Sequence, residues 1–164
     1  MSVYKSRRKD AAAQFIVEAR KLRRDTMRVV SKFPTSYRWI VTNNLLELAT
    51  QVYTNAVRGN AVYVHKDMSR QDFELRHRYL MMAATAADAL LSEITFCYEL
   101  VDEGNNFFSG KAEYDDVFEK WTAQGREARK RIEGIIESDK TKFKNYQKKR
   151  EEASAKKQQQ TKAQ

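Results

Sequence analysis

The sequence contains very few of the residues that crosslink a chain or interrupt a helix. Its 164 residues include one cysteine, one proline and five glycines. The single cysteine, Cys97, cannot form an internal disulfide, and the charged N-terminal residues lack the apolar core of a signal peptide. We therefore expect a cytoplasmic protein whose backbone is free to form long helices.

Long apolar runs and strand-like alternation are missing as well. No apolar run approaches the ~20 residues of a membrane span, so no membrane partner is expected. No segment of useful length alternates apolar and polar residues with the period of a strand, and apolar residues recur instead at helical spacing. The sequence predicts an all-α fold, an antiparallel up-down four-helix bundle.

The bundle is expected to occupy residues 10–150. Residues 1–9 form a short basic arm, and residues 151–164, EEASAKKQQQTKAQ, are a low-complexity tail for which we expect disorder. A loop rich in Gly and Asn, residues 102–110, separates the third helix from the fourth. The expected helices span about residues 10–32, 34–63, 70–101 and 110–150.

The second expected helix, which begins at Pro34, carries two apolar faces. One is the usual core-facing stripe. The other lies about 100° away and contains Trp39, Leu46 and Tyr53 at intervals of seven residues. A monomeric bundle needs only one apolar face, so the second predicts contact with another subunit or another protein. The alternative is that these three side chains widen the core stripe.

The net charge of +9 is concentrated at the two ends of the chain. Residues 1–32 hold ten Lys and Arg against three Asp and Glu, and residues 140–164 hold nine against two. The body between them, residues 33–139, holds 12 against 17. Basic ends on a mildly acidic body suggest attraction to a polyanion, of which nucleic acid is the commonest.

Basic side chains of the first helix gather on the face opposite its apolar stripe, where phosphate contact and plain solubility are competing interpretations. The basic segment after residue 139 continues the apolar stripe of the fourth helix, which favours a helical extension with exposed lysines. Candidate nucleic-acid contacts from these segments and from the arm are Arg7, Arg8, Arg20, Lys21, Arg24, Arg28, Lys140, Lys142 and Lys144.

Arg76 is a basic residue on an otherwise apolar side of the third helix, in line with Ala83 and Ala87. Asp72 lies one turn earlier on the same line, so a partly buried ion pair between these two side chains is one interpretation. A functional arginine is the other. The sequence alone leaves both open.

Patterns typical of catalysis or metal binding are nearly absent. Glu74 and His77 have Glu-x-x-His spacing, but a di-iron bundle site needs a second such motif and two further inward carboxylates. The sequence has no phosphate-binding glycine loop, no paired zinc ligands and no nucleophile with a matching base. We expect no enzyme activity, no metal and no cofactor, and a role in binding or assembly.

Five short stretches resemble those of a known family. They are MSVYKSRR at the N-terminus, KFPTSYRW from Lys32, the segment Asn55 to Val64, FELRHRY from Phe73 and SDKTKF from Ser138. The family is a group of bacterial four-helix bundles that includes the proteins encoded in ribosomal RNA intervening sequences and the accessory variability proteins of diversity-generating retroelements. The similarity extends over about residues 1–150.

The resemblance implies a basic, barrel-like homopentamer that binds nucleic acid, RNA or DNA, and a reverse transcriptase. In that role the protein would support mutagenic copying of a template RNA into cDNA without catalytic residues of its own. Matching positions add Arg38, Arg76 and Arg78 to the candidate nucleic-acid contacts. The alternative is a structural bundle that associates with the ribosome or its RNA and has no direct role in reverse transcription.

Overall fold

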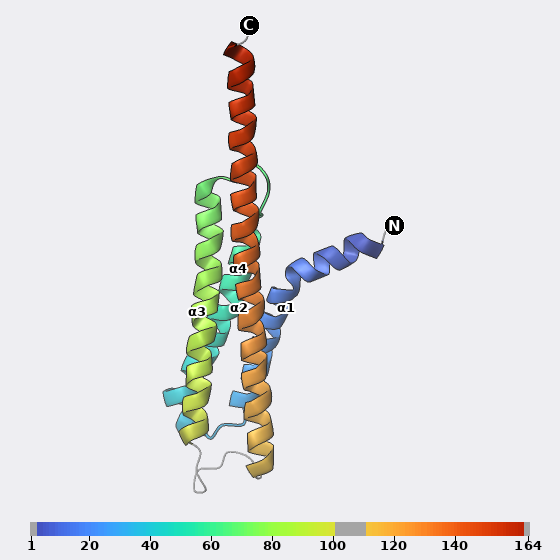
Figure 1. The fold of residues 1–164 in the computed structure, drawn as a ribbon. Coiled ribbons are helices and arrows are strands. Elements are labelled where there is room, and N and C mark those ends of the chain that lie inside the picture. Colours follow the sequence, from blue (N-terminus) through green and yellow to red (C-terminus); the bar gives the residue numbers. More distant parts are fainter. Residues whose placement is uncertain (1–2, 101–110, 163–164) are drawn as a thin grey trace.

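The chain folds into four long helices joined by connectors. The helices are α1 (Val3–Val30), α2 (Asn43–Ala61), α3 (Arg70–Leu100) and α4 (Lys111–Lys162). The computed structural model describes residues 3–100 and 111–162. Neighbouring pairs pack together, α1 with α2, α2 with α3, α3 with α4 and α4 with α1, and successive helices run in opposite directions (Figure 1). An all-α fold of four packed helices is thereby confirmed.

A hydrophobic core runs between the four helices. Each helix contributes large apolar side chains that are almost fully removed from solvent, such as Phe15, Leu45, Leu90 and Trp121. These residues belong to stripes with helical spacing, so each helix buries one face, and this burial is the main force that holds the bundle together. The indole N–H of Trp121 also donates to the buried hydroxyl of Thr26 at 2.9 Å, which ties α4 to α1.

The beginning of the second helix is irregular, so the prediction of one uninterrupted helix from Pro34 was wrong. The backbone N–H of Tyr37 donates to the carbonyl of Pro34 at 3.0 Å in a 3-10 helix, Thr35–Tyr37. A π-helix, Arg38–Thr42, follows before α2 begins. Because a π-turn contains more residues than an α-turn, it changes the direction of side chains before α2. Trp39 and Ile40 are 84% and 75% exposed.

Two helices are longer than the sequence predicted. α1 begins at Val3, within the expected arm, and its first turns point away from the other helices (Figure 1). α4 continues to Lys162 and projects past the α2–α3 connector, where disorder was expected. Residues 151–162 contain no Gly or Pro and are mostly Ala, Glu, Lys and Gln, which have high helix propensity. The loop expected at residues 102–110 lies outside the described residues.

The third helix begins where the sequence predicted. The hydroxyl of Ser69 accepts a hydrogen bond from the backbone N–H of Asp72 at 3.0 Å and donates to the Asp72 carboxylate at 2.7 Å. The first bond is the N-cap half of a capping box, and the second joins the two side chains in place of the usual bond from Glu to the backbone N–H of the cap residue. Asp72 is therefore occupied at the helix terminus rather than paired with Arg76.

By length and composition alone, α3 could cross a membrane, and it is the one helix of the described residues that meets this test. The expectation that no apolar stretch approaches the length of a membrane span is corrected accordingly. The core helices of soluble bundles meet the same test. Here α3 packs against α2 and α4 and carries the buried Arg76, so its apolar composition fits a helix within a bundle.

Candidate nucleic-acid interface

The basic ends of the chain lie in the same half of the bundle. α1 begins, and α4 ends, in the half that carries the α2–α3 connector (Figure 1). Residues 1–32 and 140–164 carry most of the excess positive charge. The first turns of α1 and the basic end of α4 therefore contribute to the positive potential of one half of the molecule. The rest of α1 runs to the other end of the bundle, where Lys32 pairs with Glu113 at 3.0 Å.

The outward side of α1 displays four predicted candidates, Arg20, Lys21, Arg24 and Arg28, all exposed. Arg24 Nε and Arg28 Nη1 lie 3.4 Å and 3.7 Å from the same carboxylate oxygen of Asp25. Two arginines that share one carboxylate leave a net positive charge. The surface therefore keeps cations available for phosphate oxygens.

Two cations of α4 that were not among the predicted contacts, Lys130 and Arg131, join this surface. Together with Gln14 and Phe15 of α1, they line a hollow between the two helices of about 340 Å³. Arg131 also pairs with Glu127 at 2.6 Å. We call the combined surface the α1/α4 basic face. Its members are Arg20, Lys21, Arg24, Arg28, Lys130 and Arg131.

A hydrogen-bonded carboxylate, Glu18, lies at the junction of the same two helices. The side-chain amide of Gln124 donates to Glu18 at 3.0 Å, and that of Gln14 donates at 2.8 Å. The Gln124 contact most strongly lowers the pKa of Glu18, and Gln14, Lys21 and Arg131 lower it further, against the opposing effect of burial. Glu18 is thus a negative group held between the two helices by hydrogen-bond donors, with Lys21 and Arg131 nearby.

The remaining predicted contacts are dispersed. Lys140, Lys142 and Lys144 are exposed on α4, and Lys140 Nζ pairs with Glu137 at 2.7 Å. Arg78 is exposed on α3, which lies diagonally across the bundle from α1. Arg7 and Arg8 lie in α1 and Arg38 in the π-helix, and the positions of their side chains are outside the described part of the chain.

Arg76 does not belong to the surface, because it is 7% exposed inside the bundle. Its Nε donates to Asp139 of α4 at 2.6 Å, and its Nη1 donates to the carbonyls of Gly59 and Val62 at 2.7 Å and 2.9 Å. The interpretation that Arg76 pairs with Asp72 was wrong, and its partner in the buried ion pair is Asp139. With its donors engaged in this way, Arg76 is removed from the set of phosphate contacts.

The predicted second apolar face of α2 is only partly free. Leu46 and Tyr53 are half-buried and pack against the protein's own core. The guanidinium of Arg23 lies over the Tyr53 ring, 5.7 Å from its centroid. Trp39 differs, because the π-helix leaves it 84% exposed. Leu46 and Tyr53 thus widen the core stripe, and a subunit contact through Trp39 stays a prediction.

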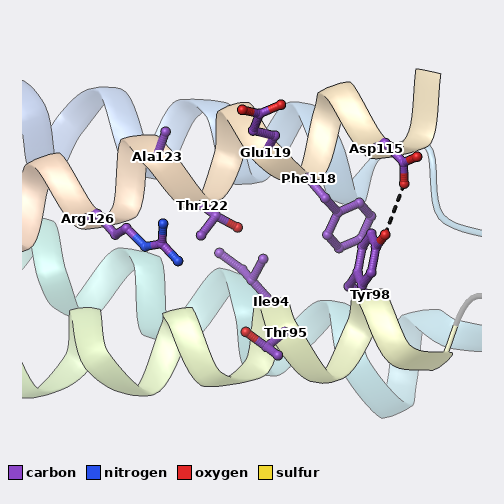
Figure 2. Close-up of a pocket in the computed structure, with 9 residues that line it drawn as sticks. All are labelled: Ile94, Thr95, Tyr98, Asp115, Phe118, Glu119, Thr122, Ala123 and Arg126. Carbon is purple, nitrogen blue, oxygen red and sulfur yellow. Dashed lines mark hydrogen bonds between the residues drawn. The ribbon is translucent and has the colours of Figure 1, made fainter. Parts of the chain in front are cut away.

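A separate groove of about 490 Å³ lies between α3 and α4 (Figure 2). Tyr98 of α3 donates its hydroxyl to Asp115 of α4 at 3.0 Å, and its ring stacks on Tyr114. Asp115 and Glu119 supply two carboxylates to the groove and Arg126 one cation. Its chemistry opposes phosphate binding, so we do not assign nucleic acid to it. The groove is lined by Ile94, Thr95, Tyr98, Asp115, Phe118, Glu119, Thr122, Ala123 and Arg126.

The described residues show no arrangement that resembles a metal centre. No group of three or more His, Cys, Asp or Glu among them could hold a metal ion. Glu74 pairs with Arg70 at 2.8 Å, and the His77 ring stacks on Phe73. Burial raises the pKa of the Cys97 thiol to about 12, with a further contribution from Glu93. This thiol is therefore protonated near neutral pH, and the thiolate is the reactive form.

Comparisons with known proteins do not identify the chain. No protein-family model matches it, and neither a curated protein nor a solved structure does so.

Proposed function

We propose that this protein is a non-catalytic nucleic-acid-binding accessory factor that works with a reverse transcriptase and its template RNA. The observation that carries the proposal is the α1/α4 basic face. Six exposed cations from two helices gather there beside three half-buried carboxylates, Glu18, Asp25 and Glu127. A surface of this kind attracts phosphates through charge and does not require a particular sequence.

The identity of the protein partner comes from the resemblance to retroelement accessory proteins. Three of the resembling stretches lie together in the fold. Arg76 in FELRHRY pairs with Asp139 in SDKTKF and donates to two carbonyls of the segment Asn55 to Val64. A reverse transcriptase gene beside the gene for this protein, and copurification of the two products, would support the partner directly.

Self-association is the second part of the proposal, and the outward side of α3 supports it. Met82 lies seven residues after Leu75 and Phe96 fourteen residues after Met82, and the three side chains are 39%, 47% and 49% exposed. Spacing by multiples of seven places them along one line of the helix. Apolar side chains in such a row are typical of a surface that another chain covers. We infer that a second copy covers it, and by resemblance the complete assembly is a pentamer.

The central test reverses the charge of the α1 part of the basic face. Substitution of Arg20, Lys21, Arg24 and Arg28 by Glu should abolish binding to both RNA and DNA while helicity is retained, because all four side chains are exposed. For the unchanged protein, log K should fall linearly with log salt, with a slope of about −0.7 to −0.9 for each neutralised phosphate. Anisotropy titrations at several salt concentrations measure both quantities.

A matched control makes the same change in total charge at other positions on the surface. Reversal of Arg70, Arg78, Lys120 and Arg126, exposed residues outside the α1/α4 basic face, should weaken binding much less. Equal losses from the two variants would mean that net charge alone drives binding. Absence of binding by the unchanged protein at low salt would contradict the proposed function itself.

A further inference from the structure

The connector between α2 and α3 presents two aromatic rings to solvent. Its backbone is extended at Val62, with φ −89° and ψ 107°, and in extended backbone alternate side chains point to opposite sides. Val62 and Val64 are half-buried, whereas Tyr63 is 76% exposed and His65 is also exposed. The inward valines thus hold both rings on the outer side.

The two rings are arranged as a nearly parallel pair. Their centroids lie 6.2 Å apart and their planes differ by 12°. The backbone N–H of Asp67 donates to His65 Nδ1 at 3.3 Å, which orients the imidazole. Exposed parallel rings offer flat surfaces on which the faces of other planar groups can stack.

Cations lie beside this pair, and hydrogen bonds hold one of them, Arg150, against the connector. Arg150 Nε donates to the carbonyl of Lys66 at 2.9 Å, and Nη2 donates to the carbonyls of Lys66 and Met68, at 3.0 Å for the latter. Among the described residues, its hydrogen-bond partners are carbonyl groups, so no carboxylate neutralises its charge. The adjoining hollow, about 380 Å³, is lined by Lys66, Asp67, Tyr146, Lys149, Arg150 and Ala153.

We propose that this corner of the bundle binds unpaired nucleotides of a single-stranded nucleic acid. Bases stack on Tyr63 and His65, and phosphates lie against Lys66, Lys149 and Arg150, whose three charges outnumber that of Asp67. In a duplex the faces of the bases are covered by their neighbours, so only unpaired bases can use the rings. This inference rests on the proposed function and adds to it the form of nucleic acid that is preferred.

The test compares single and double strands with variants of the ring pair. The probe is a labelled RNA of about 16 nucleotides without self-complementarity, alone or annealed to its complement. Tyr63→Ala combined with His65→Ala should lower affinity for the single strand about fivefold to a hundredfold. Affinity for the duplex should change by less than about twofold, because the phosphate contacts are kept.

Two further variants separate stacking from other effects. Tyr63→Phe keeps the ring and should retain single-strand affinity. Trp39→Ala removes another highly exposed aromatic side chain, outside the connector, and should leave single-strand affinity unchanged. Thermal melts of all variants should coincide, because every altered side chain is exposed.

Three results would be decisive. A selective loss of single-strand binding in the double variant supports the inference. Equal effects on single strand and duplex, or none, overturn it while the proposed function stands. Absence of binding by the unchanged protein to either probe overturns the proposed function and this inference together.

Discussion

At the scale of single residues, the most consequential side chain is Arg76, which joins three helices. It comes from α3, pairs with Asp139 of α4, and donates to Gly59 and Val62 at the C-terminal end of α2. Carbonyls in the last turn of a helix lack partners within that helix. Arg76 donates hydrogen bonds to two of these carbonyls and brings positive charge to the negative end of the helix dipole. Its role in the described structure is to fasten the bundle.

Removal of one partner of this pair should destabilise the fold strongly. Arg76→Ala leaves the Asp139 carboxylate, 5% exposed, without its counter-charge, and also leaves two carbonyls without their donor. We expect the free energy of unfolding to fall by about 3–5 kcal/mol. Arg76→Ala combined with Asp139→Ala should cost less than the sum of the single changes, because the pair is directly coupled. Chemical denaturation of the four proteins measures this cycle.

An exposed pair on the same helix provides the comparison. Arg70 and Glu74 are also joined, at 2.8 Å, but their side chains are 81% and 56% exposed. Arg70→Ala should cost less than about 1 kcal/mol. Similar costs for Arg70→Ala and Arg76→Ala would contradict the structural role assigned to Arg76.

At the scale of helices and connectors, the periodicity of apolar residues predicted the helices and their buried faces but not their interruptions. Hydrophobic spacing identifies a buried stripe, yet a single π-turn at Arg38–Thr42 leaves the stripes on both sides intact. The cap at Ser69 was predictable because its partner, Asp72, lies three residues away. Local signals of this kind can be read directly from the sequence.

Contacts between distant parts of the chain could not be predicted in the same way. Arg76 and Asp139 are 63 residues apart, and nothing local selects Asp139 over the nearer Asp72. Lys130 and Arg131 lie in a stretch of mixed charge between Glu127 and Glu133. Only the packing of α4 against α1 adds them to the basic face.

The extension of α4 gives a test at this scale. Deletion of residues 151–164 removes three Lys and two Glu and should leave the melting temperature nearly unchanged, with a small loss of nucleic-acid affinity. Deletion from Lys140 also removes Phe143, whose ring stacks on Phe73 with centroids 4.1 Å apart, and Arg150. That change should lower the free energy of unfolding by at least about 3 kcal/mol, the typical cost of losing a buried Phe.

Thermal melts and anisotropy titrations of both truncations would measure these effects. The longer deletion should also reduce the salt dependence of binding, because it removes nine Lys and Arg. If the shorter deletion alone eliminated binding, the last turns of α4 would be the site, and the α1/α4 basic face would be the wrong assignment.

At the scale of the whole molecule, charge and apolar surface occupy different sides. The α1/α4 basic face lies on one edge of the bundle, and the row of Leu75, Met82 and Phe96 lies on α3, diagonally across from α1. An assembly that covered α3 would therefore leave the basic face of each copy open. Several copies would then present several basic faces at once, which raises affinity for a long polyanion without new contacts.

Self-association through α3 is the last prediction, and it separates assembly from binding. Light scattering at micromolar concentration should give a mass several times that of the 19.2 kDa chain. Met82→Glu combined with Phe96→Glu places charges in the apolar row and should shift the mass toward that of one chain with helicity retained, because both side chains are about half exposed. Met27→Glu, at a 53% exposed position on α1, is the control and should leave the mass unchanged. A single-chain mass for the unchanged protein would contradict the assembly, whereas an unchanged mass for the double variant would move the contact away from α3, with Trp39 as the next residue to change.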